Sequence, residues 1–362
     1  MSCGPRAERR TRARSWPGLA ATLLELEPTL TVDQLRAAIS GRHLRQARTP
    51  WLILLPLVGA FAATSANDLV PFELSAPVAQ LLATGAPTIV AVLLVMFSRR
   101  FLGGRSLTDY GLAIDRRWWI DLTVGFTVAV LAVCIPFLVA IGAGWADVVA
   151  TFDPGDLTLW PAILLLTVAM LCTGFWEDLV LRGVFLCNTA DGLRRWLSPQ
   201  PRDRRGLGLS ALVFALGHLG QTGVSITLLT FILSGFVLGV VYLVSGNLAL
   251  VIGAHAAFNI TANVLFDRGG QATAGFSAIM RLEVDPTLTL LRQGGLLEAA
   301  AFLLLGLFAL LWLRHSRGTV TIDLAALHLD AADSAAEPAP VPASASAPFG
   351  HEYTDVRSDR DQ

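Results

Sequence analysis

Eight apolar runs, separated by short polar segments, constrain this chain more than any other feature of its sequence. A transmembrane helix needs about 20 consecutive apolar residues, and most of the runs reach or approach that length. Only 15% of the residues are charged, whereas soluble globular domains carry about 25%. The sequence therefore predicts an all-α, polytopic membrane protein with about eight transmembrane helices. The runs cover residues 51–66, 74–97, 118–144, 157–186, 207–219, 224–244, 248–266 and 295–313.

The segments between the runs alternate in charge. Cytoplasmic loops of membrane proteins are enriched in Lys and Arg, so the alternation predicts which loops lie inside. An inner N-terminus and eight spans put both termini in the cytoplasm. All basic residues here are arginine, a bias typical of GC-rich genomes, and we expect a bacterial cytoplasmic membrane. The inner segments hold Arg99, Arg100, Arg105, Arg116 and Arg117, then Arg194, Arg195, Arg202, Arg204 and Arg205, then Arg314 and Arg317; the outer ones hold Asp68, Glu73, Asp147, Asp153 and Asp156, and the last long loop is mixed.

Composition divides the chain into three parts. Residues 1–49 are polar and rich in arginine, which predicts a cytoplasmic arm. Residues 50–318 contain the apolar runs and form the predicted membrane domain. Residues 319–362 are rich in Ala, Pro and Ser and lack the apolar surface needed to fold alone, so we expect a disordered tail.

The fourth apolar run contains two adjacent carboxylates and an arginine: Glu177, Asp178 and Arg182. An ionised side chain at the centre of a bilayer costs roughly 2.5–3.5 kcal/mol on the insertion scale, so such groups are candidate functional residues. In the alternative interpretation the helix ends before Glu177, and the charges lie at the membrane surface. Residues 179–185 continue the apolar character, which favours the intramembrane interpretation.

Two later runs add polar residues at helical spacing. His218 follows Phe214 by four residues, and Asn259 follows His255 by four, so each pair lies on one helix face. Taken alone, a buried histidine is more often a packing residue, and a buried asparagine more often joins two helices by a hydrogen bond. Together with Glu177, however, these side chains have the composition of a site that activates water.

The chemistry of such a site is hydrolytic. Glu177 can act as general base on a water that attacks a carbonyl carbon, and Asn259 can donate to the developing oxyanion. The histidines can share the water or bind a metal. If a divalent metal such as zinc is used, Glu177, His218 and His255 are its candidate ligands, with water in the open position. A mechanism without any cofactor is equally compatible with the sequence.

At these residues the sequence resembles the CPBP intramembrane proteases, also called the Abi or CAAX-protease family, which includes the eukaryotic prenyl-protein endopeptidases. The family pattern is Glu-Glu-x-x-x-Arg, then Phe-x-x-x-His, then His-x-x-x-Asn or Asp. This chain has the three motifs in the same order, and the resemblance covers residues 107–266. It departs from the pattern at Asp178, where the family has a second glutamate.

The resemblance implies a role for each matched residue. Glu177 would activate the hydrolytic water with His218 as its partner, and His255 and Asn259 would complete the site and stabilise the oxyanion. Arg182 would be mainly structural. Asp178 keeps the charge of the second glutamate but is shorter by a methylene, so a direct role for it is in doubt.

We therefore expect an intramembrane endopeptidase that acts on CAAX-type substrates or in peptide or bacteriocin maturation. Two alternatives stay open: a non-catalytic membrane scaffold or bacteriocin self-immunity factor, and a proton-coupled transporter with a relay through Glu177 and His218. The expected partners are membrane lipid and a peptide or membrane-protein substrate, with or without a lipid group. The net charge of -1 gives no reason to expect a nucleic-acid partner.

Overall fold

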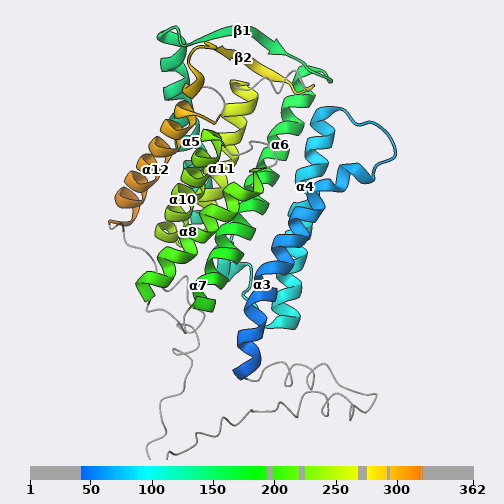
Figure 1. Ribbon diagram of the computed structural model, residues 1–362, viewed down its shortest axis with the longest axis vertical. Coiled ribbons are helices and arrows are strands. Elements are labelled where there is room, and N and C mark those ends of the chain that lie inside the picture. The colour runs from blue at the N-terminus through cyan, green and yellow to red at the C-terminus, as the bar shows by residue number, and fades with distance from the viewer. Residues whose placement is uncertain are drawn as a thin grey trace, which may run out of the picture.

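The computed structural model describes residues 42–193, 199–219, 225–267, 275–291, 294–318 and 320. The predicted N-terminal arm and C-terminal tail lie outside these residues, apart from 42–49 and Val320. The described part is mostly helical (Figure 1). Its α-helices are α3 (Arg42–Ala63), α4 (Ala76–Leu102), α5 (Arg116–Gly142), α6 (Leu159–Asp178), α7 (Cys187–Leu193), α8 (Pro199–Gly217), α10 (Ile226–Ser245), α11 (Ala249–Ile260) and α12 (Leu296–Arg317).

Shorter segments complete the fold. Two π-helical segments, η3 (Leu179–Leu186) and η4 (Thr261–Leu265), continue α6 and α11 without a break. Short stretches of 3-10 helix form η1 (Thr64–Leu69), η2 (Thr108–Tyr110) and η6 (Thr289–Leu291). Through η3, the α6 and α7 helices form one continuous helix of 35 residues, Leu159–Leu193.

The number of full-length spans is lower than expected. Within the described part of the chain, six helices are long and apolar enough to cross a membrane. The fifth and seventh apolar runs lie on shorter helices, Arg205–Gly217 and Ala249–Leu265. Each of the eight runs thus forms a helix, but the predicted count of eight transmembrane helices is not confirmed.

Helix α11 lies at the centre of the bundle, between α5 and α6. All residues from Ala249 to Phe258 are buried. Glycines permit its close approach to both neighbours. A Cβ atom on Gly253 would overlap the carbonyl oxygen of Leu122 on α5, and one on Gly174 of α6 would lie 3.0 Å from the backbone nitrogen of Ala256. The helix that carries His255 and Asn259 is therefore fixed on both sides by backbone contact.

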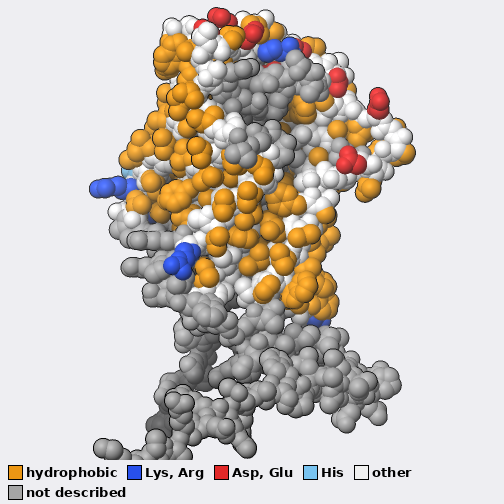
Figure 2. Space-filling view, in the orientation of Figure 1, with side chains coloured by type: hydrophobic (Ala, Val, Ile, Leu, Met, Phe, Trp, Pro, Cys, Tyr) orange, Lys and Arg blue, Asp and Glu red, His pale blue; other side chains and the backbone are white. Residues whose placement is uncertain are grey.

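The outside of the bundle is apolar between its two ends. Figure 2 shows hydrophobic side chains over most of the visible side of the bundle and Asp and Glu side chains near one end. Large apolar residues such as Leu93, Leu164 and Leu303 are more than half exposed. In a soluble protein such a surface would be unfavourable, but in an integral membrane protein it faces lipid.

A two-stranded sheet corrects the all-α prediction. β1 (Ala146–Asp153) pairs antiparallel with β2 (Ala278–Val284), in a register that places Ala146 opposite Val284 and Asp153 opposite Ala278. The sheet covers one end of the bundle (Figure 1), called the sheet end below. Arg281 of β2 pairs with Asp153 of β1 and, at 3.5 Å, with Asp267, which accounts for part of the mixed charge in the last long loop.

Arginines gather at the opposite end, called the arginine end below. It is formed by the C-termini of α4 and α12 and the N-termini of α5 and α8. This separation of charge follows the pattern used to predict orientation, but the cytoplasmic position of the termini stays a prediction. The described arginines at this end are Arg99, Arg100, Arg105, Arg116, Arg117, Arg205, Arg314 and Arg317.

Candidate active site

Glu177 and Asp178 lie midway along the 35-residue helix and not at its end. Glu177 is 7% exposed, and Asp178 and Arg182 are completely buried. The alternative in which the helix ends before Glu177 is therefore wrong. The continuation to Leu193 also removes a conflict of depth, because α7 and the start of α8 lie near the same end of the bundle. His218, just beyond the end of α8, can thus reach the level of Glu177.

The helix changes to π geometry directly after the two carboxylates. π-Helical turns are rare and occur frequently at functional sites. Their i→i+5 pattern frees backbone groups, and here the carbonyl of Leu181 accepts a hydrogen bond from Ser210 Oγ of α8 at 2.8 Å. The irregular turn thereby connects the helix of Glu177 to the helix that leads to His218.

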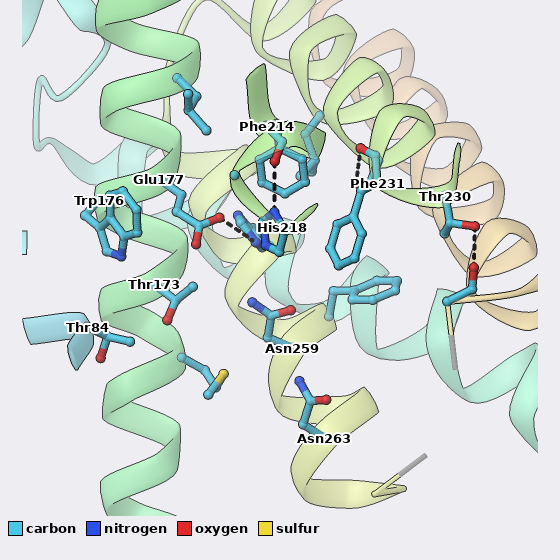
Figure 3. A pocket seen from close by; sticks show the side chains of 18 of the residues that line it. Thr84, Thr173, Trp176, Glu177, Phe214, His218, Thr230, Phe231, Asn259 and Asn263 are labelled. Carbon is cyan, nitrogen blue, oxygen red and sulfur yellow. Dashed lines mark hydrogen bonds and ion pairs between the residues drawn. The ribbon is translucent and has the colours of Figure 1, made fainter. Parts of the chain in front are cut away.

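A cavity of about 790 Å³ lies inside the bundle. Glu177, His218, His255 and Asn259 all line it, together with residues of α3, α4, α10 and α12. Figure 3 shows Glu177, His218 and Asn259 directed into this space from three different helical segments. Asp178 and Arg182 are not among its lining residues. The cavity thus separates the six candidate residues into four that line it and two that lie behind its wall.

His255 is held between the two carboxylates. Its Nδ1 lies 3.3 Å from Asp178 Oδ2, and its Nε2 lies 3.8 Å from Glu177 Oε2. A carboxylate only accepts hydrogen bonds, so in the neutral imidazole Nδ1 carries the hydrogen and Nε2 presents its lone pair towards Glu177. The distance to Glu177 is too long for a direct hydrogen bond and suits a bridging water.

Arg182 neutralises Asp178 behind the cavity wall. Its Nη1 lies 3.0 Å from Asp178 Oδ1, and its guanidinium carbon lies 4.3 Å from the centre of the Phe214 ring. The ion pair and the cation–π contact offset part of the cost of burying the guanidinium. Phe214, the first residue of the second motif, therefore packs on the arginine of the first.

His218 is positioned by backbone and aromatic contacts. Its Nδ1 lies 2.9 Å from the carbonyl oxygen of Phe214, which again places the hydrogen on Nδ1 and the lone pair on Nε2. The ring stacks on Phe231 of α10 with centroids 4.1 Å apart. These contacts restrain the imidazole at the cavity wall.

Two further polar residues of the cavity were missed from the sequence. Asn263 lies one turn after Asn259 and lines the same cavity (Figure 3). Glu298, in the first turn of α12, also lines it and is 4% exposed. A signal existed for each: Asn263 continues the i, i+4 face of His255 and Asn259, and Glu298 is a carboxylate within an apolar run.

The segment that contains the three motifs matches a known family. Residues 158–261 match the model of a family described as type II CAAX prenyl endopeptidase Rce1-like. These residues form an Rce1-like domain of the CPBP family. The family is a protease family. No curated protein and no solved structure matches the chain.

The Rce1-like domain runs from α6 to the end of α11 and contains all six candidate residues. The cavity extends beyond it, because Phe61, Thr84 and Glu298 lie on helices outside the match. The predicted resemblance to the CPBP family is confirmed, whereas the role of each residue stays a prediction.

The donor set does not fit a three-ligand metal site. Over the described ranges, no three His, Cys, Asp or Glu side chains come close enough together to hold a metal ion. Of the predicted ligands, Glu177 and His255 approach each other, and His218 has its Nδ1 engaged with Phe214. The arrangement of Glu177 and His255 suits a water held by the two side chains themselves.

Proposed function

We propose that this chain is an intramembrane endopeptidase that hydrolyses a peptide bond with a water activated by Glu177. The observation that carries the proposal is the cavity, which brings Glu177, His218, His255 and Asn259 to one buried space in an Rce1-like domain. The substrate is a peptide or membrane-protein segment, with or without a lipid group, in a bacterial cytoplasmic membrane.

The reaction uses the water between Glu177 and His255. Glu177 removes one of its protons while the oxygen attacks the carbonyl carbon of the scissile bond. His255 Nε2 accepts a hydrogen bond from the second hydrogen of the water and so orients it. The proton on Glu177 then passes to the leaving nitrogen as the C–N bond breaks, which yields a carboxylic acid and an amine.

The remaining side chains orient and stabilise. The amide of Asn259 donates to the oxyanion of the tetrahedral intermediate, an interaction of the kind that supplies about 2.7–4 kcal/mol elsewhere. His218 accepts a hydrogen bond at its Nε2 from water or substrate. Asp178 fixes the tautomer of His255, and Arg182 keeps Asp178 ionised.

Glu177→Gln tests the proposal, because it keeps the shape of the side chain and removes the base. Purified protein in lipid nanodiscs is offered fluorogenic peptides with and without a prenyl-cysteine. We expect the variant to lose about 10²–10⁴-fold in kcat, a typical contribution of general-base catalysis. Glu283→Gln, which changes an exposed glutamate of β2, is the matched control. Equal cleavage by wild type and Glu177→Gln would remove Glu177 from the mechanism.

A further inference from the structure

The cavity extends from Glu177 in one direction only. Its other lining residues belong to helix ends at the sheet end of the bundle: Gln80 and Thr84 near the start of α4, Thr227 and Thr230 near the start of α10, and Phe276 just before β2. The space therefore leads from the candidate catalytic residues towards the sheet end.

Towards the arginine end the bundle is packed. Leu179, Val180 and Leu181, which follow Glu177 and Asp178, are at most 1% exposed. Further on, polar contacts join the loops to α7: Arg105 pairs with Asp191 at 2.8 Å, and Asn188 Nδ2 donates to Tyr110 Oη at 3.1 Å. Burial of Tyr110 raises its pKa, which keeps that hydroxyl neutral. A substrate consequently meets a closed wall from this side.

The cavity and its surroundings are acidic. Glu177 and Glu298 line it, and none of the described residues around it is Lys or Arg. Glu177 Oε2 is buried and makes no hydrogen bond within the described structure. An acidic, low-dielectric cavity concentrates field lines and attracts cations. The carboxylates of the surrounding sheet-end segments are Asp147, Asp153, Asp156, Glu283 and Asp285.

Glu298 is held rigidly in the cavity wall. Its Oε1 accepts the backbone N–H of Gly294, and the carbonyl of Gly294 accepts Thr230 Oγ1 at 2.6 Å. Gly294 has a φ of +73°, and a Cβ there would overlap Thr227, so the turn depends on glycine. These contacts fix a carboxylate of α12 in the cavity that also contains the proposed base.

We infer that the cavity is filled from the sheet end by a positively charged peptide segment, whose cationic group contacts Glu298. With the arginine end in the cytoplasm, this segment comes from the extracytoplasmic side. That the bound segment is a substrate rests on the proposed function, whereas the direction of access does not.

Cysteine labelling tests the direction of access. Asn263→Cys in the cavity, Asp147→Cys in β1 and Arg116→Cys at the arginine end are treated in spheroplasts with a membrane-impermeant maleimide. The parent chain, with its own cysteines, is the blank. We expect labelling of Asn263→Cys and Asp147→Cys in intact spheroplasts and of Arg116→Cys only after lysis. Labelling of Asn263→Cys only after lysis, together with Arg116→Cys, would overturn the inference.

Peptide selectivity tests the role of Glu298. Three short fluorogenic peptides differ only in a central Arg, Gln or Glu next to the cleaved bond. We expect kcat/KM for the Arg peptide to exceed that for the Gln peptide about tenfold, as a charge-assisted contact provides, and the ratio to fall towards one in Glu298→Gln. This substitution retains a side-chain oxygen that can accept the N–H of Gly294, and Glu283→Gln is the control. No preference for Arg in the wild type would overturn the inference.

Protection separates this inference from the proposed function. The Arg peptide should slow maleimide labelling of Asn263→Cys, and the Glu peptide should not. If protection is observed but no peptide is cleaved, the cavity assignment stands and the endopeptidase proposal fails. If peptides are cleaved without protection or Arg preference, the reverse holds.

Discussion

Asp178 contacts two side chains of the site at once. One carboxylate oxygen lies 3.0 Å from Arg182 and the other 3.3 Å from His255. From the sequence alone its role is in doubt, because the family has a longer glutamate at this position. The geometry favours a positioning role: Asp178 stays behind the cavity wall and orients the imidazole that faces Glu177.

Removal of this carboxylate should be costly. In Asp178→Ala the guanidinium of Arg182 stays buried without this counter-ion, and the loss of one partner of a buried ion pair destabilises proteins by about 3–5 kcal/mol. We expect a clear fall in the thermal unfolding temperature of the detergent-solubilised protein. The control is Asp153→Ala, whose partner Arg281 is 25% exposed and should contribute about 1 kcal/mol or less. Equal shifts for the two variants would contradict the positioning role.

The polar residues of the three motifs could be identified from the sequence, because charge in an apolar helix is costly and therefore conspicuous. Glu298 was not, since it stands near the start of its apolar run and can be taken for an interfacial residue. Asn263 carries no charge and lies beyond the motif. Only the tertiary arrangement shows that both share the cavity with Glu177.

At the scale of elements, α11 is the helix on which the site depends most. It presents His255 and Asn259 to the cavity, and its position is set by backbone contact with α5 and α6. Small residues allow such contact between membrane helices. A displacement of α11 would move both side chains relative to Glu177.

Gly253→Ala should therefore reduce stability and activity together. The added methyl would overlap the carbonyl oxygen of Leu122, and overpacking of this kind costs about 1–3 kcal/mol. Gly85→Ala is the matched control, because a Cβ there has no neighbour within 4 Å and alanine favours a helix. Thermal unfolding and peptide cleavage measure the two effects. Comparable behaviour of the two variants would show that the close approach of α5 and α11 is unimportant.

Element positions were largely predictable. All eight apolar runs lie on helices, because hydrophobic length is a strong local signal. The two strands were not predicted. They lie far apart in the sequence, and most of β1 is exposed or half-buried, so its pattern lacks the alternation of a strand with one buried face. Their pairing is a long-range property of the folded chain.

At the scale of the whole molecule, the two ends of the bundle differ. The cavity reaches towards the sheet end, whereas the arginine end is joined by polar contacts. Asp121 of α5, which is 2% exposed, accepts hydrogen bonds from Asn247 at 2.9 Å, Arg317 at 3.2 Å and Trp312 at 3.4 Å. These contacts connect α5 and α12 with the turn between α10 and α11.

Arg317→Gln should loosen this closed end. Arg317 also donates to the carbonyl oxygens of Val244 and Ser245, so its loss removes several charge-assisted bonds, each contributing about 1.5–3 kcal/mol. Arg314→Gln, in the same last turn of α12 but exposed, controls for the loss of charge. Hydrogen exchange at the start of α5 and chemical denaturation report the difference. A larger effect of Arg314→Gln would contradict this account.

The architecture could be predicted only in part. Composition and apolar runs led to a mostly helical membrane protein, which is confirmed, and the motifs led to the CPBP family. Sequence periodicity does not tell which helices are neighbours, so the cavity and its acidic lining could not be predicted. The same is true of the ion pair behind its wall.

The π-helical segments determine where the chain tolerates insertions and deletions. Deleting one residue within Leu179–Leu186 would restore regular α geometry and rotate α7 by about 100° relative to Glu177. Asn188 and Asp191 would then leave their partners Tyr110 and Arg105. A single deletion there changes the angular phase of everything that follows, whatever residue is removed. The length of this segment is thus under stricter constraint than the identity of its apolar side chains.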